Sequence, residues 1–376
     1  MAGPLTGYKV LEFAGLGPGP FCAMMLADMG AEVIRIDRHS AAFSGTGRTI
    51  VERGRRTISM NIKATGAHDV VMKLIQNTDV LIEGYRPGVM ERLGYGPEVC
   101  LEANPALVYG RMTGWGQTGP LAQTAGHDLN YIAITGALHA MGYKDRPPTP
   151  PLHVVGDLGA GAMSLAFGIV CALLERSKSG QGQVIDAAIS DATSTLVTPY
   201  HGMMANGRWN PERQSNLLDG AAHFYACYAC ADGKFISVGA IEPQFYQAFR
   251  DILDLTDPDF DDQWDTARWP LLTKKLTTLF LTRTRDEWWA RFQGSDACVA
   301  PVLSFEEAQQ FAHHTERHGF TQTNGAIHPA PSPKFSRTPA QARPMAEKAG
   351  AHTLDILQGL GLNEKDIQTL HQAGVI

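Results

Sequence analysis

Short apolar segments and segments with helical periodicity alternate along the first half of the chain. Apolar or alternating runs predict strands at 8–13, 31–37, 57–62, 79–83, 106–112 and 183–189. Helices with one buried face are expected at 21–29, 68–77, 157–177 and 191–204, because apolar residues recur there at intervals of three and four. Strands that alternate with helices at this spacing predict an α/β fold with a parallel, doubly wound sheet.

The second half of the chain predicts a smaller α+β domain at 221–310. A hairpin is expected at 224–238, followed by helices from Pro243, at 270–281 and after the capping box at Thr284 to Glu287. The looser stretch 206–220 would link this domain to a large one formed by 1–205 and 330–376. The last helix would lie between Asn363 and Gly374.

Composition narrows the class of protein. The 376 residues, 44% of them hydrophobic, are enough for two cores, and a net charge of −6 gives no general attraction to nucleic acid or membranes. No apolar run is expected to reach the ~20 residues of a membrane helix, and no signal peptide is recognised, so we expect a cytoplasmic protein. The six cysteines are expected to be reduced and buried, with Cys227 and Cys230 in packing roles rather than on zinc.

A glycine-rich turn, Gly15 to Pro20, follows the first predicted strand. With Asp37 about twenty positions later, it resembles a dinucleotide-binding fingerprint. However, Pro20 replaces the third glycine, and Arg38 follows the acid directly. A nicotinamide-dependent dehydrogenase therefore remains an alternative on this local pattern alone.

A basic run breaks the acidic balance of the chain. Between residues 35 and 63 there are seven Lys or Arg against two acids, namely Arg35, Arg38, Arg48, Arg53, Arg55, Arg56 and Lys63 against Asp37 and Glu52. Such a run most often forms a solvated face. Here it surrounds strand ends, where α/β proteins bind ligands, so several charges could converge on a small ligand with more than one phosphate.

His127 and Asp157 are the candidate proton carriers. His127 follows the glycine-rich loop 113–120, and Asp157 precedes an apolar helix that contains Gly159 and Gly161. The alternatives are a hydrogen-bonded structural histidine and an N-cap, since aspartate is among the preferred N-cap residues. The glycines favour a site at the helix N-terminus, because they leave backbone N–H groups uncovered for an oxyanion.

Taken together, several motifs give the chain a specific resemblance over nearly its whole length. It resembles the family III CoA-transferase superfamily, and within it the branch that racemises 2-methylacyl-CoA thioesters. The motifs are Gly15 to Pro20, Gly84 to Gly88, Gly114 to Pro120, Gly126 to Asp128, Gly156-Asp157 and Gly239 to Tyr246. The resemblance implies an interlocked homodimer, with large and small domains joined by linkers at 206–220 and 311–329.

The resemblance also assigns roles to residues. It implies that His127 and Asp157 transfer protons and that Glu242 is the partner of His127. On position alone, Glu242 would be an ordinary acid at a helix start. The resemblance gives CoA binding to Arg38, Met60, Asn61, Ile62, Lys63, Gly84, Tyr85, Arg86, Arg92, Gly126, Asp128, Leu129, Asn130 and Tyr131.

The implied reaction is racemisation at carbon 2 of the thioester. One group must remove the α-proton and another must return a proton on the opposite face, while the N-terminus of the Asp157 helix stabilises the enolate. This chemistry requires neither a metal nor a redox cofactor. The acyl chain stays open among branched fatty, sterol-derived and aryl-propionyl thioesters.

Two other functions fit the same residues. In a family III CoA-transferase, which moves CoA between carboxylic acids, Asp157 would attack the thioester and form an aspartyl anhydride. In a non-enzymatic protein, the same site would only bind CoA thioesters. His127 favours the racemase, because transfer does not need a second base.

Overall fold

The structure is a computed structural model that describes residues 3–38, 50–345 and 347–376. The chain divides into two compact units. The first comprises Met1–Thr135, Leu152–Leu196 and Arg317–Ile376, and the second comprises Gly136–Pro151 and Val197–Glu316. The division differs from the expected domain boundaries: 136–151, 197–205 and the expected linker 206–220 belong to the second unit, and most of the expected linker 311–329 belongs to the first.

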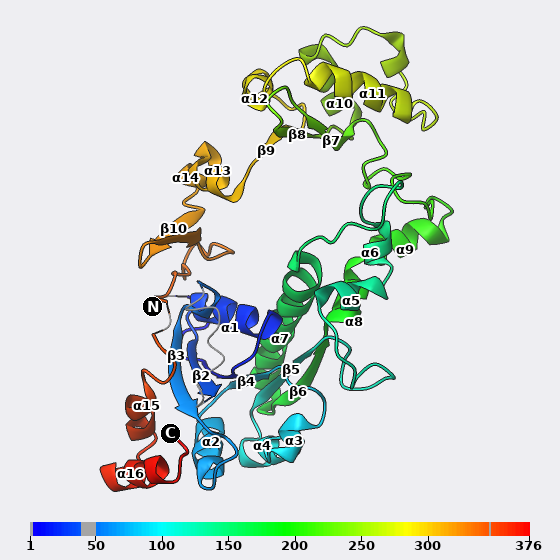
Figure 1. The fold of residues 1–376 in the computed structure, drawn as a ribbon. Helices are drawn as coiled ribbons and strands as arrows, with labels where there is room; N and C mark the ends of the chain where they lie inside the picture. The colour runs from blue at the N-terminus through cyan, green and yellow to red at the C-terminus, as the bar shows by residue number, and fades with distance from the viewer. Residues whose placement is uncertain (1–2, 39–49, 346) are drawn as a thin grey trace. The chain divides into compact units, whose positions relative to one another are not determined.

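Six parallel strands form the sheet of the first unit within the described residues, in the order β3-β2-β1-β4-β5-β6 (Figure 1). They are β1 (Lys9–Phe13), β2 (Glu32–Arg38), β3 (Arg55–Met60), β4 (Val80–Glu83), β5 (Val108–Thr113) and β6 (Gln183–Ala188). The predicted doubly wound parallel sheet is therefore confirmed. The strand order reverses between β1 and β4, and such a reversal creates a crevice at the carboxyl ends of the strands.

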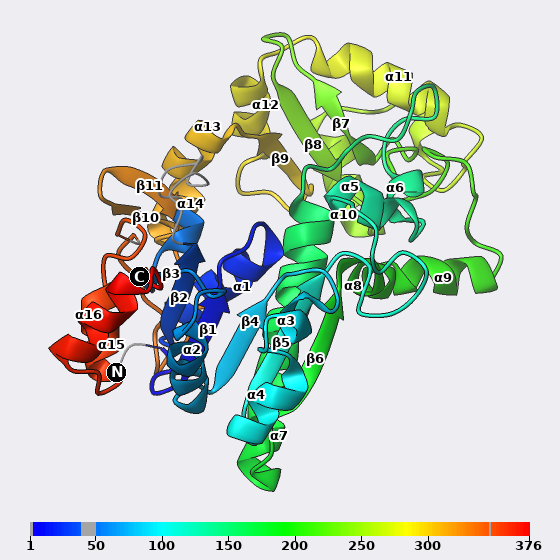
Figure 2. The same ribbon diagram turned by 60° about the horizontal axis from the view of Figure 1, so that its bottom comes forward.

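Helices cover both faces of this sheet (Figures 1 and 2). One face packs against α1 (Pro18–Asp28) and α7 (Met163–Ser179), and the other against α2 (Ala67–Gln76), α4 (Pro97–Ala103), α15 (Thr353–Gly359) and α16 (Glu364–Gln372). Neighbouring residues of β1 separate the two cores, because successive side chains of a strand point to opposite faces. Val10 lies in the α1 and α7 core, and Leu11 lies in the other.

Short elements surround the carboxyl edge of the sheet. They are α3 (Val89–Arg92), α5 (Asp128–Ala133) and α8 (Ile189–Leu196). The helix expected at 191–204 is in fact two helices, α8 and α9 (Thr198–Ala205). Pro199 explains the break, because proline lacks a backbone N–H and its ring clashes with the preceding helical turn.

The expectation about long apolar helices was wrong. A π-helical segment (Val154–Ala162) runs directly into α7, and together they form a helix of 26 residues that is long and apolar enough to cross a membrane by length and composition alone. One side of α7 packs into the core through residues such as Leu165, Ile169 and Leu173. The other side is apolar and exposed at Met163, Phe167, Val170 and Leu174.

The basic run serves structure more than ligand binding. Arg53 bonds to Asp28 at 2.5 Å and Arg55 to Glu12 at 3.0 Å, and all four side chains are buried. Arg35 pairs with Asp37 at 2.8 Å and Glu52 at 2.5 Å, and Arg56 pairs with Glu32 and Asp355. Arg38 and Lys63 remain exposed, and Arg48 lies outside the described residues. Arg53 and Arg55 are therefore not available to a ligand, because buried guanidinium groups require paired carboxylates, whereas Arg38 and Lys63 are.

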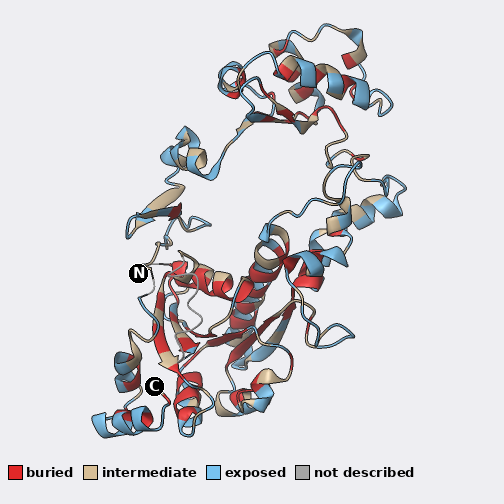
Figure 3. Cartoon of the chain, in the orientation of Figure 1, coloured by how far each residue is buried: buried red, intermediate tan, exposed pale blue. Residues whose placement is uncertain are grey.

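The second unit is built on an antiparallel sheet of β7 (Tyr225–Ala229), β8 (Phe235–Gly239) and β9 (Val299–Val302). The predicted hairpin of β7 and β8 is confirmed, whereas β9 was not expected. The aromatic core of the second unit lies between this sheet and α10 (Pro243–Ile252), α11 (Trp269–Phe280) and α12 (Arg285–Phe292). Figure 3 colours the buried parts of these elements red. The expectation that all six cysteines are buried was wrong, since Cys171, Cys227 and Cys298 are exposed.

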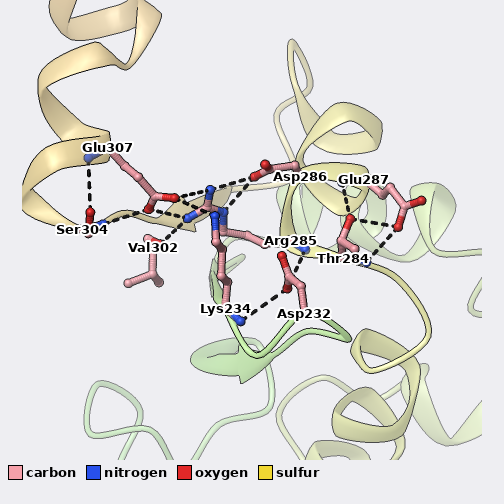
Figure 4. A network of polar contacts seen from close by, with 9 residues as sticks. All are labelled: Asp232, Lys234, Thr284, Arg285, Asp286, Glu287, Val302, Ser304 and Glu307. Carbon is pink, nitrogen blue, oxygen red and sulfur yellow. Dashed lines mark hydrogen bonds and ion pairs between the residues drawn. The ribbon is translucent and has the colours of Figure 1, made fainter.

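A charged cluster fixes the end of β9 in the second unit (Figure 4). Arg285 donates two hydrogen bonds to Glu307 in α13 (Phe305–Gln310), at 2.7 and 3.0 Å, and a third to the Val302 carbonyl. Lys234, after the hairpin turn, bonds to the same carboxylate at 2.7 Å. These bonds hold the pKa of Glu307 well below its usual range. The capping box at Thr284 is confirmed.

The remaining elements include segments that the sequence pattern did not reveal. Two strands, β10 (Phe320–Thr323) and β11 (Ala326–Pro329), form an antiparallel hairpin in the first unit, where a linker was expected. In the second unit, α6 (Ala137–Ala140) belongs to the segment 136–151, and α14 (Ala312–Glu316) follows α13. Arg213 attaches 136–151 to this unit by donating to the carbonyls of His139, Tyr143 and Arg146.

Candidate active site

The predicted ligand-binding segments gather at the carboxyl edge of the parallel sheet. Arg38 ends β2, residues 60–63 follow or end β3, and the loop 84–88 follows β4. The register aligns these ends, since Arg38 is opposite Met60. Burial raises the pKa of Tyr85, and a hydrogen bond from Arg38 acts against that shift. Arg38 and Tyr85, two of the residues expected to bind CoA, thus meet across the end of β1.

A hollow of about 360 Å³ lies beside this edge. It is lined by Ile62, Lys63, Ala64, His68, Arg92, Leu93 and Tyr95, of which Ile62, Lys63 and Arg92 were expected to bind CoA. The buried Tyr95 donates a hydrogen bond to the Ile62 carbonyl at 3.1 Å and stacks on His68 with 5.4 Å between the rings. Sequence reasoning missed Tyr95 and His68, because only the fold brings α2 beside the chain after α3.

Arg111 fixes the loop that carries Tyr85 and Arg86. This buried side chain of β5 bonds to Glu83 at 2.9 Å and to Glu91 in α3 at 2.8 Å. Glu83 also accepts the Tyr85 N–H at 2.7 Å. One guanidinium therefore braces both the loop after β4 and the short helix that ends at Arg92. No motif in the sequence indicated this role for Arg111.

Asp157 is not an N-cap, contrary to the sequence-based alternative. It lies inside the π-helical segment, whose N-cap is His153. The Leu158 N–H bonds to the His153 carbonyl five residues back, and the Asp157 N–H donates to Asp128 instead of to the helix. Because both N–H groups are occupied, they are not free donors for an enolate. π-helical turns of this kind are rare and occur frequently at functional sites.

The Asp157 carboxyl group points at the glycine turn after β1. A Cβ atom built on Gly17 would lie 2.9 Å from Oδ2 of Asp157. Gly17 also has a φ of +68°, so both space and backbone conformation require glycine. The turn that resembles a dinucleotide fingerprint therefore faces a carboxyl group. A pyrophosphate at this place would be repelled, which weakens the dehydrogenase alternative.

The electrostatic surroundings of Asp157 suit proton transfer. Burial is the main cause that raises its pKa to about 6, and the negative charge of Asp128 adds to the shift. The nearby His153 and His127 act in the opposite direction. His127 and Asp157 therefore lie close enough to interact electrostatically. A carboxyl group with a pKa near the working pH can act both as a base and as an acid.

His127 is exposed at the start of α5, where it is the N-cap residue and forms a capping box with Asn130, so it has the hydrogen-bonded structural role that the sequence offered as an alternative. The backbone N–H of His127 donates to Oδ1 of Asn130 at 3.1 Å. The preceding Gly126 packs under Tyr131, whose hydroxyl donates to the Gly126 carbonyl and whose ring meets Trp115 edge to face at 4.8 Å. A Cβ atom on Gly126 would lie 2.7 Å from the Tyr131 ring, so this packing requires glycine.

The other expected site residues differ in their surroundings. Leu129 and Asn130 are exposed on α5 and Asn61 after β3, whereas Met60 and Asp128 are buried. Burial raises the pKa of Tyr131; the charge of Asp157 adds to the shift and that of Arg86 opposes it, so Arg86 also lies near this group. Glu242 belongs to the second unit, where it is the exposed N-cap of α10. Its charge contributes, after burial, to the raised pKa of Cys298.

Comparison with known proteins identifies the class. The model of CoA-transferase family III matches residues 5–353, and the chain belongs to this family. It is 42% identical to the alpha-methylacyl-CoA racemase of Mus musculus, with 99% of this chain and 97% of the relative covered. Identity to the alpha-methylacyl-CoA racemase of Homo sapiens is 39%, over 99% of this chain and 97% of that protein.

A solved structure supports the fold independently of sequence. A CAIB/BAIF family protein from Brucella suis superposes with a TM-score of 0.80 at 23% identity, covering 96% of this chain and 100% of that one. The predicted resemblance to the family III CoA-transferases is confirmed by the family match over residues 5–353.

Replacement of Asp157 by asparagine should stabilise the protein at alkaline pH. The folded state holds the Asp157 proton more tightly than the unfolded state, so ionisation between about pH 4 and 6 lowers stability as pH rises. We expect Asp157→Asn to raise the melting temperature at pH 8, because the variant lacks the poorly solvated negative charge. The expected rise is only about 1–2 °C, because solvent screens part of that charge in the wild type. At pH 4 the two proteins should melt together.

The matched control is Asp186→Asn. This exposed carboxylate also accepts a backbone N–H, from Gln117 at 3.0 Å. In thermal denaturation followed by circular dichroism, the melting temperature of Asp186→Asn should not rise relative to the wild type as pH increases. An Asp157→Asn protein that is less stable at pH 8 than at pH 4, relative to the wild type, would contradict the burial argument.

Proposed function

We propose that this chain racemises 2-methylacyl-CoA thioesters by removing and returning the proton at carbon 2 through an enolate. The observation that carries the proposal is the partly buried Asp157, a carboxyl group whose pKa is raised to about 6 and on which the charge of the nearby His127 acts. The racemases of mouse and human support it, since they match nearly the whole chain.

The chemistry requires two groups on opposite faces of the acidic carbon. One removes the α-proton while the other protonates the enolate, and their roles exchange for the opposite enantiomer. General acid–base catalysis contributes about 10²–10⁴-fold, and one oxyanion donor about 10²–10³-fold. The donors must be groups other than the Asp157 and Leu158 N–H groups, which are already bonded.

The CoA moiety would lie along the carboxyl edge of the sheet. Lys63 and Arg92 line the hollow beside β3, and Arg38 meets Tyr85 at the reversal of strand order. CoA carries a 3′-phosphate and a pyrophosphate, and charge-assisted hydrogen bonds from such cations are strong. The exposed residues of loop 84–88 and of α5 would bind the rest of the thioester. Glu242 would hold the imidazole of His127, as the resemblance implies.

We also propose that the protein is a homodimer. The exposed side of α7 carries Met163, Phe167, Val170 and Leu174, at the spacing of one helical face. Phe167 is 72% exposed and Leu174 is 62% exposed in the single chain. A contiguous apolar face on a helix that is already packed on its other side is typical of a protein–protein interface.

The decisive experiment is hydrogen exchange with solvent. A 2-methylacyl-CoA incubated with the protein in D₂O, without any acceptor acid, should gain deuterium at carbon 2, as measured by mass spectrometry. His127→Ala and Asp157→Asn should each lower the rate by at least about 10²-fold while CoA affinity stays within about twofold, because they act on proton transfer rather than on binding.

Other outcomes would identify the other functions. Thioester exchange that depends on an added carboxylic acid, without deuterium uptake, would show that Asp157 acts as a nucleophile in CoA transfer. CoA binding without either activity would show a binding protein. Comparison of branched fatty, sterol-derived and aryl-propionyl thioesters in the same assay would define the acyl chain.

Removal of one cation at the hollow should weaken CoA binding. Lys63→Met or Arg92→Met should each raise the CoA dissociation constant about tenfold in calorimetry, because each removes a charge-assisted contact worth about 1.5 kcal/mol or more. Lys73→Met, on the same unit but at the end of α2, is the matched control and should leave affinity unchanged. Equal affinity of all the variants would place CoA elsewhere.

A charge on the exposed face of α7 should dissociate the dimer. Phe167→Glu would bury a carboxylate in an apolar interface, so the dimer dissociation constant should rise at least about tenfold in sedimentation velocity. Ser177→Glu, in the exposed last turn of α7, is the control and should remain dimeric. A monomeric wild type at high concentration would contradict the dimer.

A further inference from the structure

We propose that Asp128 is a positioning residue for Asp157, whose backbone it holds and on whose carboxyl group its negative charge acts. The expectation from the resemblance was that Asp128 binds CoA. The catalytic consequence of this positioning role rests on the proposed function, whereas the effect of Asp128 on Asp157 can be measured without any substrate.

The geometry joins two elements that are distant in sequence. Asp128 is the first residue of α5, and Asp157 lies in the π-helical segment. Oδ1 of Asp128 accepts the Asp157 N–H at 2.6 Å, and the Asp128 residue is only 8% exposed. This bond satisfies a backbone donor that the π-helical hydrogen bonding leaves without a helical acceptor. The carboxylate therefore faces the chain around Asp157, not solvent.

Gly156 is what allows this approach. A Cβ atom at that position would lie 2.4 Å from Oδ1 of Asp128 and 2.8 Å from Cγ2 of Ile132. Any larger residue would push α5 away from the π-helical segment and break the bond. The motif Gly156-Asp157 thus has a physical explanation, since the glycine makes room for a second carboxylate behind the first.

The charge of Asp128 also acts on Asp157. In the surroundings of Asp157, burial is the largest cause of the raised pKa and Asp128 is the next. The opposing groups are His153, which precedes the π-helical segment, and His127, which precedes α5. Tyr131 of α5 also faces Asp157, since the charge of Asp157 contributes, after burial, to the raised pKa of Tyr131. Two carboxylates in one partly buried site disfavour double ionisation.

The consequence is a stronger base at the reacting carbon. A carboxylate with an ordinary pKa near 4 is a poor base for an α-proton, whereas a raised pKa brings it closer to the working pH. Asp128→Asn separates the two contributions of Asp128. The amide oxygen still accepts the Asp157 N–H, but the negative charge is lost.

Direct titration tests the inference without substrate. The carboxyl carbon of Asp157 would be followed by NMR in protein labelled with ¹³C-aspartate, with Asp157→Asn to assign the signal. Asp128→Asn should lower the titration midpoint of Asp157 by about half a pH unit or more. His153→Gln should raise it, because that change removes an opposing positive charge. Asp186→Asn should leave it unchanged.

An unchanged midpoint in Asp128→Asn would overturn the inference. If that variant does not fold, Asp128→Ser, which is uncharged but can still accept a hydrogen bond, makes the same test. The inference would equally be overturned if the titration midpoint of Asp157 were unchanged in Asp128→Ser or lower in His153→Gln.

The pH dependence of deuterium exchange then tests the catalytic consequence. In Asp128→Asn the acidic limb of the kcat profile should move to lower pH, and kcat at pH 8 should fall about 2–10-fold with KM unchanged. A purely structural role would instead lower activity equally at every pH. A wild type without exchange would overturn the proposed function, while the NMR titration would still decide the role of Asp128.

Discussion

The whole site depends on a carboxyl group that is placed where water solvates it poorly and where a second carboxylate lies behind it. Asp157 faces the turn at Gly17 on one side, while its backbone is tied to Asp128 on the other. Neither arrangement tolerates a side chain at Gly17 or Gly156. Three separate parts of the first unit, namely the loop after β1, α5 and the π-helical segment, are thus fitted around one ionisable group.

The regular framework could be predicted from the sequence, because it follows from local periodicity. The six strands of the parallel sheet and the hairpin of the second unit were found within a few residues of their observed bounds. Short elements without a full period, such as α5, β9 and the β10–β11 hairpin, were missed. The break of the helix 191–204 was also missed, although Pro199 was a usable signal.

The chemistry of the site was only partly predictable. His127 and Asp157 were found because glycine-rich turns flank them, and the charge of His127 acts on the pKa of Asp157. The sequence did not show that Arg53 and Arg55 of the basic run are structural, because Asp28 and Glu12, which neutralise them, are distant along the chain. In the same way, the bracing of the loop 84–88 depends on Arg111, which the pairing of β5 with β4 brings to Glu83 and Glu91.

The discontinuity of the first unit has a consequence for biosynthesis. Its second core includes α15, α16 and the fully buried Val375, whose carbonyl accepts the Asn61 N–H at 2.7 Å. These residues leave the ribosome after the whole of the second unit, so the part of this core that α15 and α16 cover stays exposed until this segment is translated. During that interval the apolar side chains of the first unit that α15 and α16 bury are accessible, and exposed apolar surface of this kind favours aggregation.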